Sequence, residues 1–345
     1  MTPPGSRPFD LLVAGELNPD VLVSGPDVRP AFGQVEKLVE GIRLTVGSSS
    51  AITACGAARL GLRVAFVGVV GRDLFGRSML EALEERGVDV ASCRVDPDLP
   101  TGATVILSRP ADRAILTALG TIEALRGEDL DDALLARARH LHVGSVYLQD
   151  RLRAELPSVF TRARRLGLTT SFDPNWDPTG AWDGGLDALL ATADVVLPNR
   201  EEARRMAGRD DDLAAAEVLH ARGAAAGVLH ARGAAAGGTG AGPLVAVKLG
   251  ADGGLATDGA RMIRVTAPAV PLVDTTGAGD AFDAGFLAGW LGGRDIAEAL
   301  RLAVACGALS LRAVGGTEGQ ATLAEGEALA ATLTVTEVRP GEVVP

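Results

Sequence analysis

Short apolar segments rich in Val, Leu and Ile alternate along most of the chain with longer stretches of helical periodicity. This alternation is typical of parallel strands joined by crossover helices, because helices on both faces of a parallel sheet bury its strands completely. The sequence therefore predicts an α/β fold with a parallel sheet covered on both faces. The clearest strand candidates are residues 11–14, 64–70, 140–143, 169–172, 195–197 and 244–248, and helical stretches include 78–86, 151–166 and 211–222.

Two segments, 17–46 and 99–120, interrupt this alternation. Both contain extended, partly alternating patterns of apolar and polar residues without an intervening helix. We expect them to pair into a small accessory sheet beside the main sheet. A chain of 345 residues that is 47% hydrophobic can bury a large core as one domain with a smaller appendage.

The charge balance and the cysteines exclude several classes of protein. The net charge is −11 and the pI is about 4.9, whereas nucleic acid and anionic membrane surfaces bind to a basic face. Cys55, Cys93 and Cys306 lie far apart without a Cys-x-x-Cys pair, so we expect buried, reduced thiols. No segment approaches the ~20 apolar residues that span a bilayer, and the N-terminus lacks a charged segment followed by an apolar run. These features predict a cytoplasmic protein without a membrane or nucleic-acid partner.

The segment VLHARGAAAG at 218–227 recurs without change at 228–237. Solenoid repeats have periods of about 20 to 50 residues, so this ten-residue duplication does not indicate a repeat fold. We interpret it as a tandem duplication that lengthens a surface connection. The duplication alone explains the spacing of His220 and His230, which makes a metal site formed by the two histidines the less favoured reading.

Two common nucleotide-binding motifs are absent from the sequence. The only lysines, Lys37 and Lys248, are each followed by Leu, so the chain has no GK[ST] phosphate-binding loop. The best match to a GxGxxG dinucleotide turn starts at Gly277 but has Phe282 in place of the third glycine.

Residues 273–290 form a polar, glycine-rich turn that leads directly into an amphipathic helix. Gly277, Ala278 and Gly279 would present backbone N–H groups at the helix N-terminus, where the helix dipole also favours a phosphoryl oxygen. Asp280 would accept a proton from an attacking hydroxyl there, and the positive helix end should keep its pKa low enough for the carboxylate to be ionised at neutral pH. Asp283, one turn further along, is the next candidate base. The alternative is that Asp280 only caps the helix and the glycines only form the turn.

The stretch DTTGAGDAFDAGF at 274–286 resembles the second motif of the ribokinase-like (PfkB) carbohydrate kinases over 13 contiguous positions. Further blocks resemble the family in the family order, so that the similarity covers roughly residues 10–316. These blocks are Asn18 and Asp20 in GELNPD, 47–61, 68–76, Asp173 and Asn175 in FDPN, PNREE at 198–202 and KLGADGG at 248–254.

The resemblance implies a doubly wound α/β domain whose mostly parallel sheet is flanked by helices and topped by a small β-sheet lid. Residues 1–345 would form a single ribokinase-like kinase domain with lid segments at about 17–46 and 99–120. ATP and Mg²⁺ would be its cofactors. Asp274 and Thr276 resemble positions that border a monovalent cation in some relatives.

The resemblance also implies roles for individual residues. Asp280 would be the catalytic base, with Gly277, Ala278 and Gly279 as the anion hole. The substrate would contact Asn18, Asp20, Gly47 and Ser48, the nucleotide would contact Asn199, Lys248, Gly250, Gly253 and Thr275, and Glu202 with Asn199 would help to place Mg²⁺ and phosphate. A single carboxylate acting partly through water suffices for Mg²⁺.

Simpler readings exist for several of these residues. Asn199 and Glu202 match a capping box, in which an asparagine begins a helix and a glutamate follows three residues later. Asp20 could be a turn residue. Lys248, at a strand end, could face solvent instead of the nucleotide.

The chain departs from the family where many members have Gly-Gly and an asparagine that contacts the sugar. Here Gly47 is followed by Ser48, and Ile52 replaces the amide, which argues against plain ribose. We therefore expect phosphoryl transfer from ATP to a primary hydroxyl of a sugar or sugar acid. The alternatives are a nucleoside kinase, in which Phe9, Phe32 or Trp176 stacks on the base, and a non-catalytic sugar or nucleotide sensor. An exposed edge of the lid sheet could pair across a homodimer.

Overall fold

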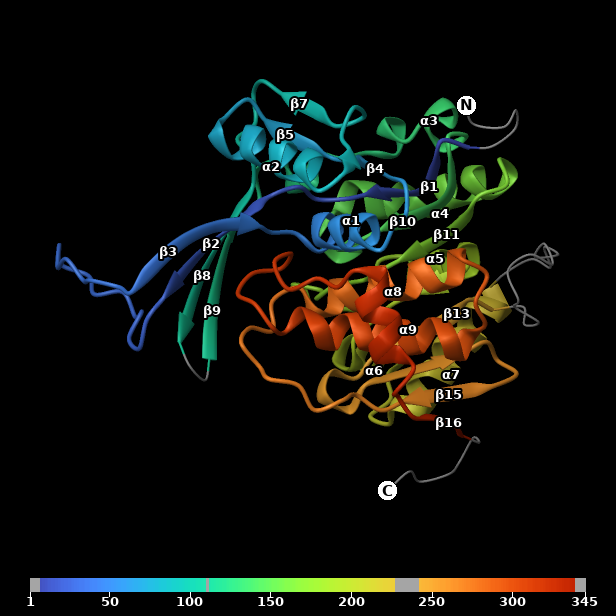
Figure 1. The fold of residues 1–345 in the computed structure, drawn as a ribbon. Coiled ribbons are helices and arrows are strands. Elements are labelled where there is room, and N and C mark those ends of the chain that lie inside the picture. The colour runs from blue at the N-terminus through green and yellow to red at the C-terminus, as the bar shows by residue number, and fades with distance from the viewer. Residues whose placement is uncertain (1–6, 110–111, 227–241, 339–345) are drawn as a thin grey trace.

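The computed structural model describes residues 7–109, 112–226 and 242–338, and its main element is a sheet of ten strands (Figure 1). The strand order is β16-β15-β14-β13-β12-β11-β10-β1-β4-β6, with parallel pairing from β6 to β13 and antiparallel pairing from β13 to β16. The predicted mostly parallel sheet is therefore confirmed. The strands are β1 (Phe9–Ala14), β4 (Val64–Val67), β6 (Val88–Asp89), β10 (Ala138–Val143), β11 (Thr169–Phe172), β12 (Val195–Val196), β13 (Leu244–Lys248), β14 (Gly254–Thr257), β15 (Met262–Val265) and β16 (Val335–Val338).

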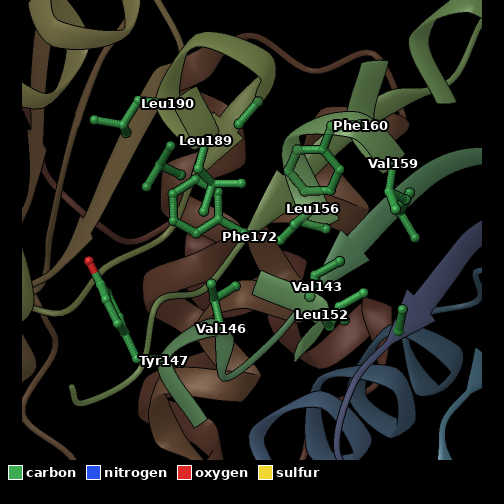
Figure 2. Close-up of a cluster of buried hydrophobic side chains, with 14 of the residues drawn as sticks. Val143, Val146, Tyr147, Leu152, Leu156, Val159, Phe160, Phe172, Leu189 and Leu190 are labelled. Carbon is green, nitrogen blue, oxygen red and sulfur yellow. The ribbon is translucent and has the colours of Figure 1, made fainter. Parts of the chain in front are cut away.

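Helices cover both faces of this sheet and divide the core into two layers. In β1, Leu12 packs into one layer, whereas Leu11 and Val13 pack into the other, as the alternation of side chains along a strand requires. Figure 2 shows the first layer, where side chains of α4 contact the strands. This layer holds α3 (Asp132–Leu135), α4 (Asp150–Arg165), α5 (Leu186–Thr192), α6 (Arg200–Ala207) and α7 (Asp212–Ala226); the second holds α1 (Ser49–Arg59), α2 (Leu74–Glu85), α8 (Ala278–Leu291), α9 (Ile296–Ser310) and α10 (Leu323–Ala330).

The segment predicted as one strand over 64–70 is divided at Gly68. Residues before it form β4, and residues after it form β5 (Val69–Gly71), which pairs with β7 (Arg94–Asp96) in a separate two-stranded sheet. A Cβ at Gly68 would lie 2.7 Å from the carbonyl oxygen of Gly15. The close approach of these two backbones explains why the chain leaves the main sheet at a glycine.

The two helix-free segments form a second sheet that extends away from the main sheet in Figure 1. We call its strands, in the order β3-β2-β8-β9, the small sheet. They are β2 (Pro19–Ser24), β3 (Gly41–Val46), β8 (Ala103–Arg109) and β9 (Asp112–Ala118). The expected accessory sheet is thus confirmed. Its outer strands expose Ile42 and Ile115, but a homodimer through this sheet stays a prediction, as does the assignment of the whole chain to one domain.

Three other expectations can be compared with the structure. Cys55, Cys93 and Cys306 are free thiols, and Cys93 is only partly buried. Within the described ranges, no helix is long and apolar enough to cross a membrane. The first copy of the duplicated segment was expected in a surface connection, but residues 218–226 continue α7, and Leu219 is fully buried there. The second copy, 228–237, lies outside the described residues.

Candidate active site

A cavity of about 520 Å³ lies at the carboxyl ends of β1, β11 and β13, and β8 and β9 of the small sheet form part of its wall. This is the edge at which open parallel sheets bind their ligands. Most of the predicted site residues meet here although they come from distant parts of the chain. Those that line the cavity are Asn18, Asp20, Ser48, Asn199, Glu202, Lys248, Gly250, Gly277, Gly279 and Asp280.

The glycine-rich turn enters α8 as the sequence predicts. Gly277 is the N-cap residue, with a left-handed φ of 74°, and a Cβ at this position would lie 2.6 Å from the carbonyl oxygen of Gly316. Both facts favour glycine at this position. The N–H of Ala278 donates to the carbonyl of Thr275 at 3.3 Å, so the turn itself uses this donor of the expected anion hole.

Asp280 lies in the first turn of α8 and borders the cavity. Burial raises the pKa of Asp280 to about 7, and the nearby carboxylate of Asp173 acts in the same direction. A hydrogen bond from Ser49 and the positive charge of Lys248 oppose this increase. The expected low pKa was therefore wrong, because desolvation outweighs the favourable field at the helix N-terminus.

Lys248 is buried beneath the cavity between two carboxyl groups. Its Nζ lies 2.8 Å from Oδ2 of Asp173 and 2.9 Å from Oδ2 of Asp283. Burial lowers the pKa of Lys248, but the two carboxyl groups outweigh this effect and raise it. The reading of Lys248 as solvent-facing is thus wrong. Its ammonium group thus supplies a positive charge to two members, Asp173 and Asp283, of the acidic cluster that Asp280 completes.

Asp283 was the second candidate for the base, but it is completely buried and does not line the cavity. Burial raises the pKa of Asp283 well above its ordinary value. In Asp173, by contrast, Lys248 outweighs the effect of burial and holds the pKa below the ordinary value. The positive charge of Lys248 thus outweighs burial at Asp173 but is outweighed by burial at Asp283.

Asn199 and Glu202 form the capping box that begins α6. The Asn199 side chain accepts from the N–H of Glu202 at 3.0 Å, and Oε2 of Glu202 accepts from the N–H of Asn199 at 2.8 Å. Burial raises the pKa of Glu202 to about 8. The two residues therefore form the capping box, and the carboxyl group of Glu202 also borders the cavity.

The predicted substrate residues lie at the small-sheet end of the cavity. Asn18 and Asp20 are buried side chains that line it, and burial raises the pKa of Asp20 to about 6. A Cβ at Gly47 would lie 2.3 Å from Oδ1 of Asp20, so glycine leaves the space that this carboxyl group needs. Ser48 is the N-cap residue of α1 and donates to the carbonyl of Glu16 at 2.9 Å. Ile52 also lines the cavity, where the family pattern has an amide.

Some predicted residues do not reach the cavity. Gly253 is packed against the backbone, because a Cβ there would lie 2.0 Å from the carbonyl oxygen of Val265. Thr275 borders a neighbouring cavity together with Arg113. The aromatic residues that we considered for base stacking, Phe9, Phe32 and Trp176, do not line the cavity, and Phe9 belongs to the core.

Asp274 was considered as part of a monovalent cation site. Its Oδ1 accepts hydrogen bonds from the N–H and the hydroxyl of Thr276, at 3.0 and 2.9 Å. Its Oδ2 accepts from the N–H of Gly315 at 2.9 Å. These bonds stabilise the turn that precedes α8, and the cation site stays a prediction.

Sequence reasoning gave no role to several residues that border the cavity, among them Glu16 and Thr104, and it did not pair Ser49 with Asp280. Glu16 is buried directly after β1 and accepts hydrogen bonds from the hydroxyls of Ser50, at 2.6 Å, and Ser145, at 2.7 Å. Its position after a buried strand, in GELNPD, was the available signal. Ser49 donates to Asp280 at 2.6 Å, a contact that no local pattern predicts, since the two residues are 231 positions apart.

Comparisons with known proteins identify the family of the chain. The model of the pfkB family carbohydrate kinases matches residues 10–323. An ATP-dependent ribose-1-phosphate kinase from Halopiger xanaduensis is 31% identical over 94% of this chain and 97% of its own. A fructokinase from Klebsiella pneumoniae is 34% identical over 78% of this chain and 86% of its own.

Among solved structures, the fructokinase from Vibrio cholerae O395, in a form with bound fructose, ADP and calcium ion, has a TM-score of 0.73 and 26% identity. The match covers 94% of this chain and 99% of that one. The chain is a member of the pfkB family of carbohydrate kinases and has the ribokinase-like fold.

Proposed function

We propose that this carbohydrate kinase transfers the γ-phosphoryl group of ATP to a primary hydroxyl of a sugar or sugar acid. The observation that carries the proposal is the position of Asp280, in the first turn of α8, within the cavity that Asn18 and Asp20 also line. A base, an anion-binding helix end and groups suited to polyol hydrogen bonding are thereby combined in one cavity.

In this proposal the protein mainly positions the reactants and stabilises charge, which is what phosphoryl transfer requires. Asp280 accepts the proton of the attacking hydroxyl. The backbone N–H groups at Gly277 and Gly279 stabilise the transferred phosphoryl group at the N-terminus of α8. Asn18 and Asp20 hold other hydroxyls of the acceptor.

The carboxyl groups in the cavity fit a divalent cation that arrives with ATP. Glu202, Asp20 and Glu16 all line it, and burial raises the pKa of each. A site that is short of positive charge favours a hard cation with oxygen ligands. Glu202 would hold Mg²⁺, partly through water, and the ion would neutralise charge on the phosphates.

The names of the relatives support ATP as donor and a sugar as acceptor. One relative is an ATP-dependent kinase of ribose-1-phosphate, and the structure of another contains fructose and ADP. A nucleoside acceptor is less favoured, because none of Phe9, Phe32 and Trp176 lines the cavity, and these were the aromatic residues expected to stack on a base. We further propose that residues 1–345 act as one kinase domain, with the small sheet as its lid.

The test is a turnover assay with ATP, Mg²⁺ and a panel of sugars, sugar acids, sugar phosphates and nucleosides, measured as release of ADP. We expect one of the sugar classes to be the best acceptor. A nucleoside as best acceptor would select the alternative kinase activity, and no turnover with any member would support the sensor.

Asp280→Asn tests the base with the best acceptor. Asparagine keeps the shape of the side chain, and α8 is capped at Gly277 without a bond from Asp280, so the fold and ATP binding should persist. A positioned base contributes about 10²- to 10⁴-fold, and kcat should fall by that order. A variant that keeps more than roughly a tenth of the wild-type kcat would exclude Asp280 as the base.

A further inference from the structure

One face of α1 packs against the start of α8. Ser49, Thr53 and Gly56 share this face, because they lie one helical turn apart along α1. The Ser49 hydroxyl donates to Oδ1 of Asp280 at 2.6 Å, and the Thr53 hydroxyl donates to the backbone carbonyl of Asp280 at 3.4 Å. At Gly56, a Cβ would lie 2.9 Å from Cβ of Ala284. The close packing of the two helices therefore holds the Ser49 hydroxyl against the carboxyl group of Asp280.

The backbone of Ser49 is fixed as well. Ser49 is the first residue of α1, and the preceding Ser48 caps the helix by accepting from the N–H of Ala51 at 3.2 Å. Oδ2 of Asp173 lies 3.5 Å from the Ser49 hydroxyl oxygen, a longer distance than that to Asp280. A hydroxyl has one proton to donate, so the shorter contact identifies Asp280 as the acceptor.

We propose that Ser49 is a positioning residue for the catalytic base: its hydroxyl holds one carboxylate oxygen of Asp280, so that the other oxygen faces the hydroxyl of the acceptor. This inference rests on the proposed role of Asp280. Without the donor, the carboxylate can rotate about its terminal torsion, which is broad and roughly two-fold in aspartate. Part of the population then turns away from the geometry that proton transfer requires.

The same hydrogen bond favours the charged form of the base. A donor to a carboxylate lowers its pKa, and Ser49 acts on Asp280 in this direction. The other charged groups around Asp280 remain when Ser49 is changed; four come from other elements, and Asp283 lies one turn further along α8. They are Glu16 after β1, Asp173 after β11, Glu202 in α6, Lys248 in β13 and Asp283 in α8.

Ser49→Ala removes the donor with little change in volume, and Ser49→Thr restores a hydroxyl at the same atom. Thr53→Val is the matched control, since it removes the neighbouring hydroxyl from the same helix face without affecting the carboxylate. Each variant is assayed with ATP, Mg²⁺ and the best acceptor between pH 5.5 and 9. We measure kcat and the KM for ATP.

For Ser49→Ala we expect kcat at pH 7 to fall about tenfold to a hundredfold, with the KM for ATP within about twofold of the wild type. The acid limb of the kcat profile should move up by about one pH unit, because activity needs the ionised carboxylate and the lost hydrogen bond favoured it. Ser49→Thr should recover most of both losses, and Thr53→Val should behave as the wild type. A Ser49→Ala enzyme with unchanged or higher kcat would overturn the proposal, since Ser49 would then only compete with the acceptor.

Failure of this inference can be distinguished from failure of the proposed function. An active Asp280→Asn enzyme would refute the assignment of Asp280 as the base. An inactive Asp280→Asn enzyme together with a fully active Ser49→Ala enzyme would refute only the positioning role of Ser49. A titration of ¹³C-labelled aspartate carboxyls by NMR needs no acceptor, and Asp280→Asn identifies the signal. The pKa of Asp280 should rise in Ser49→Ala, and an unchanged pKa would contradict the hydrogen bond.

Discussion

Replacing Lys248 by methionine should destabilise the fold strongly, because it leaves the carboxylate of Asp173 buried without a cation. The side chains of Lys248, Asp173 and Asp283 are 10%, 6% and 0% exposed, so water cannot replace the lost partner. Breaking a buried ion pair from one side typically costs about 3–5 kcal/mol. For a chain of 345 residues, with an unfolding entropy of about 2.1 cal/mol/K per residue, this corresponds to a fall in Tm of about 4–7 °C.

The loss should depend on pH in a defined direction. In the wild type, Lys248 helps to hold the pKa of Asp173 below its ordinary value. In the variant, burial is the largest effect and raises this pKa, opposed only by hydrogen bonds from Asp283 and from the backbone N–H of Asn175. The folded variant then binds a proton more tightly than the unfolded chain, whose aspartate pKa is about 3.9. Its stability therefore falls as pH rises above about 4, until the raised pKa is passed. The deficit in Tm should be smaller at pH 5.5 than at pH 8.

The assay is thermal unfolding by circular dichroism at both pH values. Lys37→Met is the matched control, because Lys37 is the only other lysine and its pair with Asp27 is exposed. An exposed pair contributes roughly 0–1 kcal/mol, so this control should melt within about 1–2 °C of the wild type. If Lys248→Met also melted within that range at pH 8, the buried pair would not support the fold as argued.

Two further variants test other parts of the chain. Glu202→Gln keeps a capping side chain and replaces a carboxyl group whose pKa burial raises to about 8, so Tm at neutral pH should be unchanged or slightly higher. The Mg²⁺ concentration for half-maximal turnover should increase, because glutamine offers the ion no carboxylate; an unaltered Mg²⁺ dependence would leave only the capping role. Deletion of residues 228–237 removes the second copy of the duplicated segment and leaves the first copy, most of which lies in α7. Tm and turnover should remain near the wild-type values. A large loss of either would show that the second copy belongs to the core or the site.

The sequence predicted what depends on contiguous residues. The polar turn and helix over 273–290 and the two helix-free segments are features of neighbouring residues, and the structure has them as the entry to α8 and the small sheet. The antiparallel continuation from β13 to β16 and the break at Gly68 were missed, because both depend on which backbones lie side by side. The periodicity of a segment contains no information about which distant backbone lies beside it.

The error for the pKa of Asp280 has the same origin. From the sequence, only the field of the helix N-terminus is evident at Asp280, because this field comes from adjacent residues. The structure adds burial and a carboxylate from Asp173, which is 107 positions away, and together these raise the pKa to about 7. Ser49 opposes them through one hydrogen bond. A carboxyl group with this pKa is close to half ionised at neutral pH, so in the proposed role of Asp280 as base, small changes in its surroundings would change the active fraction substantially.

That sensitivity gives the buried lysine a second consequence. Lys248 contacts Asp173, and both Lys248 and Asp173 act on the pKa of Asp280, in opposite directions. Their charges partly cancel at the base, so that burial remains the dominant cause of the raised pKa. The same ion pair that supports the fold thus keeps the negative charge of Asp173 from raising the pKa of the base further. If Asp280 is the base that we propose, stability and proton acceptance both depend on one buried contact, which joins the end of β11 to the end of β13.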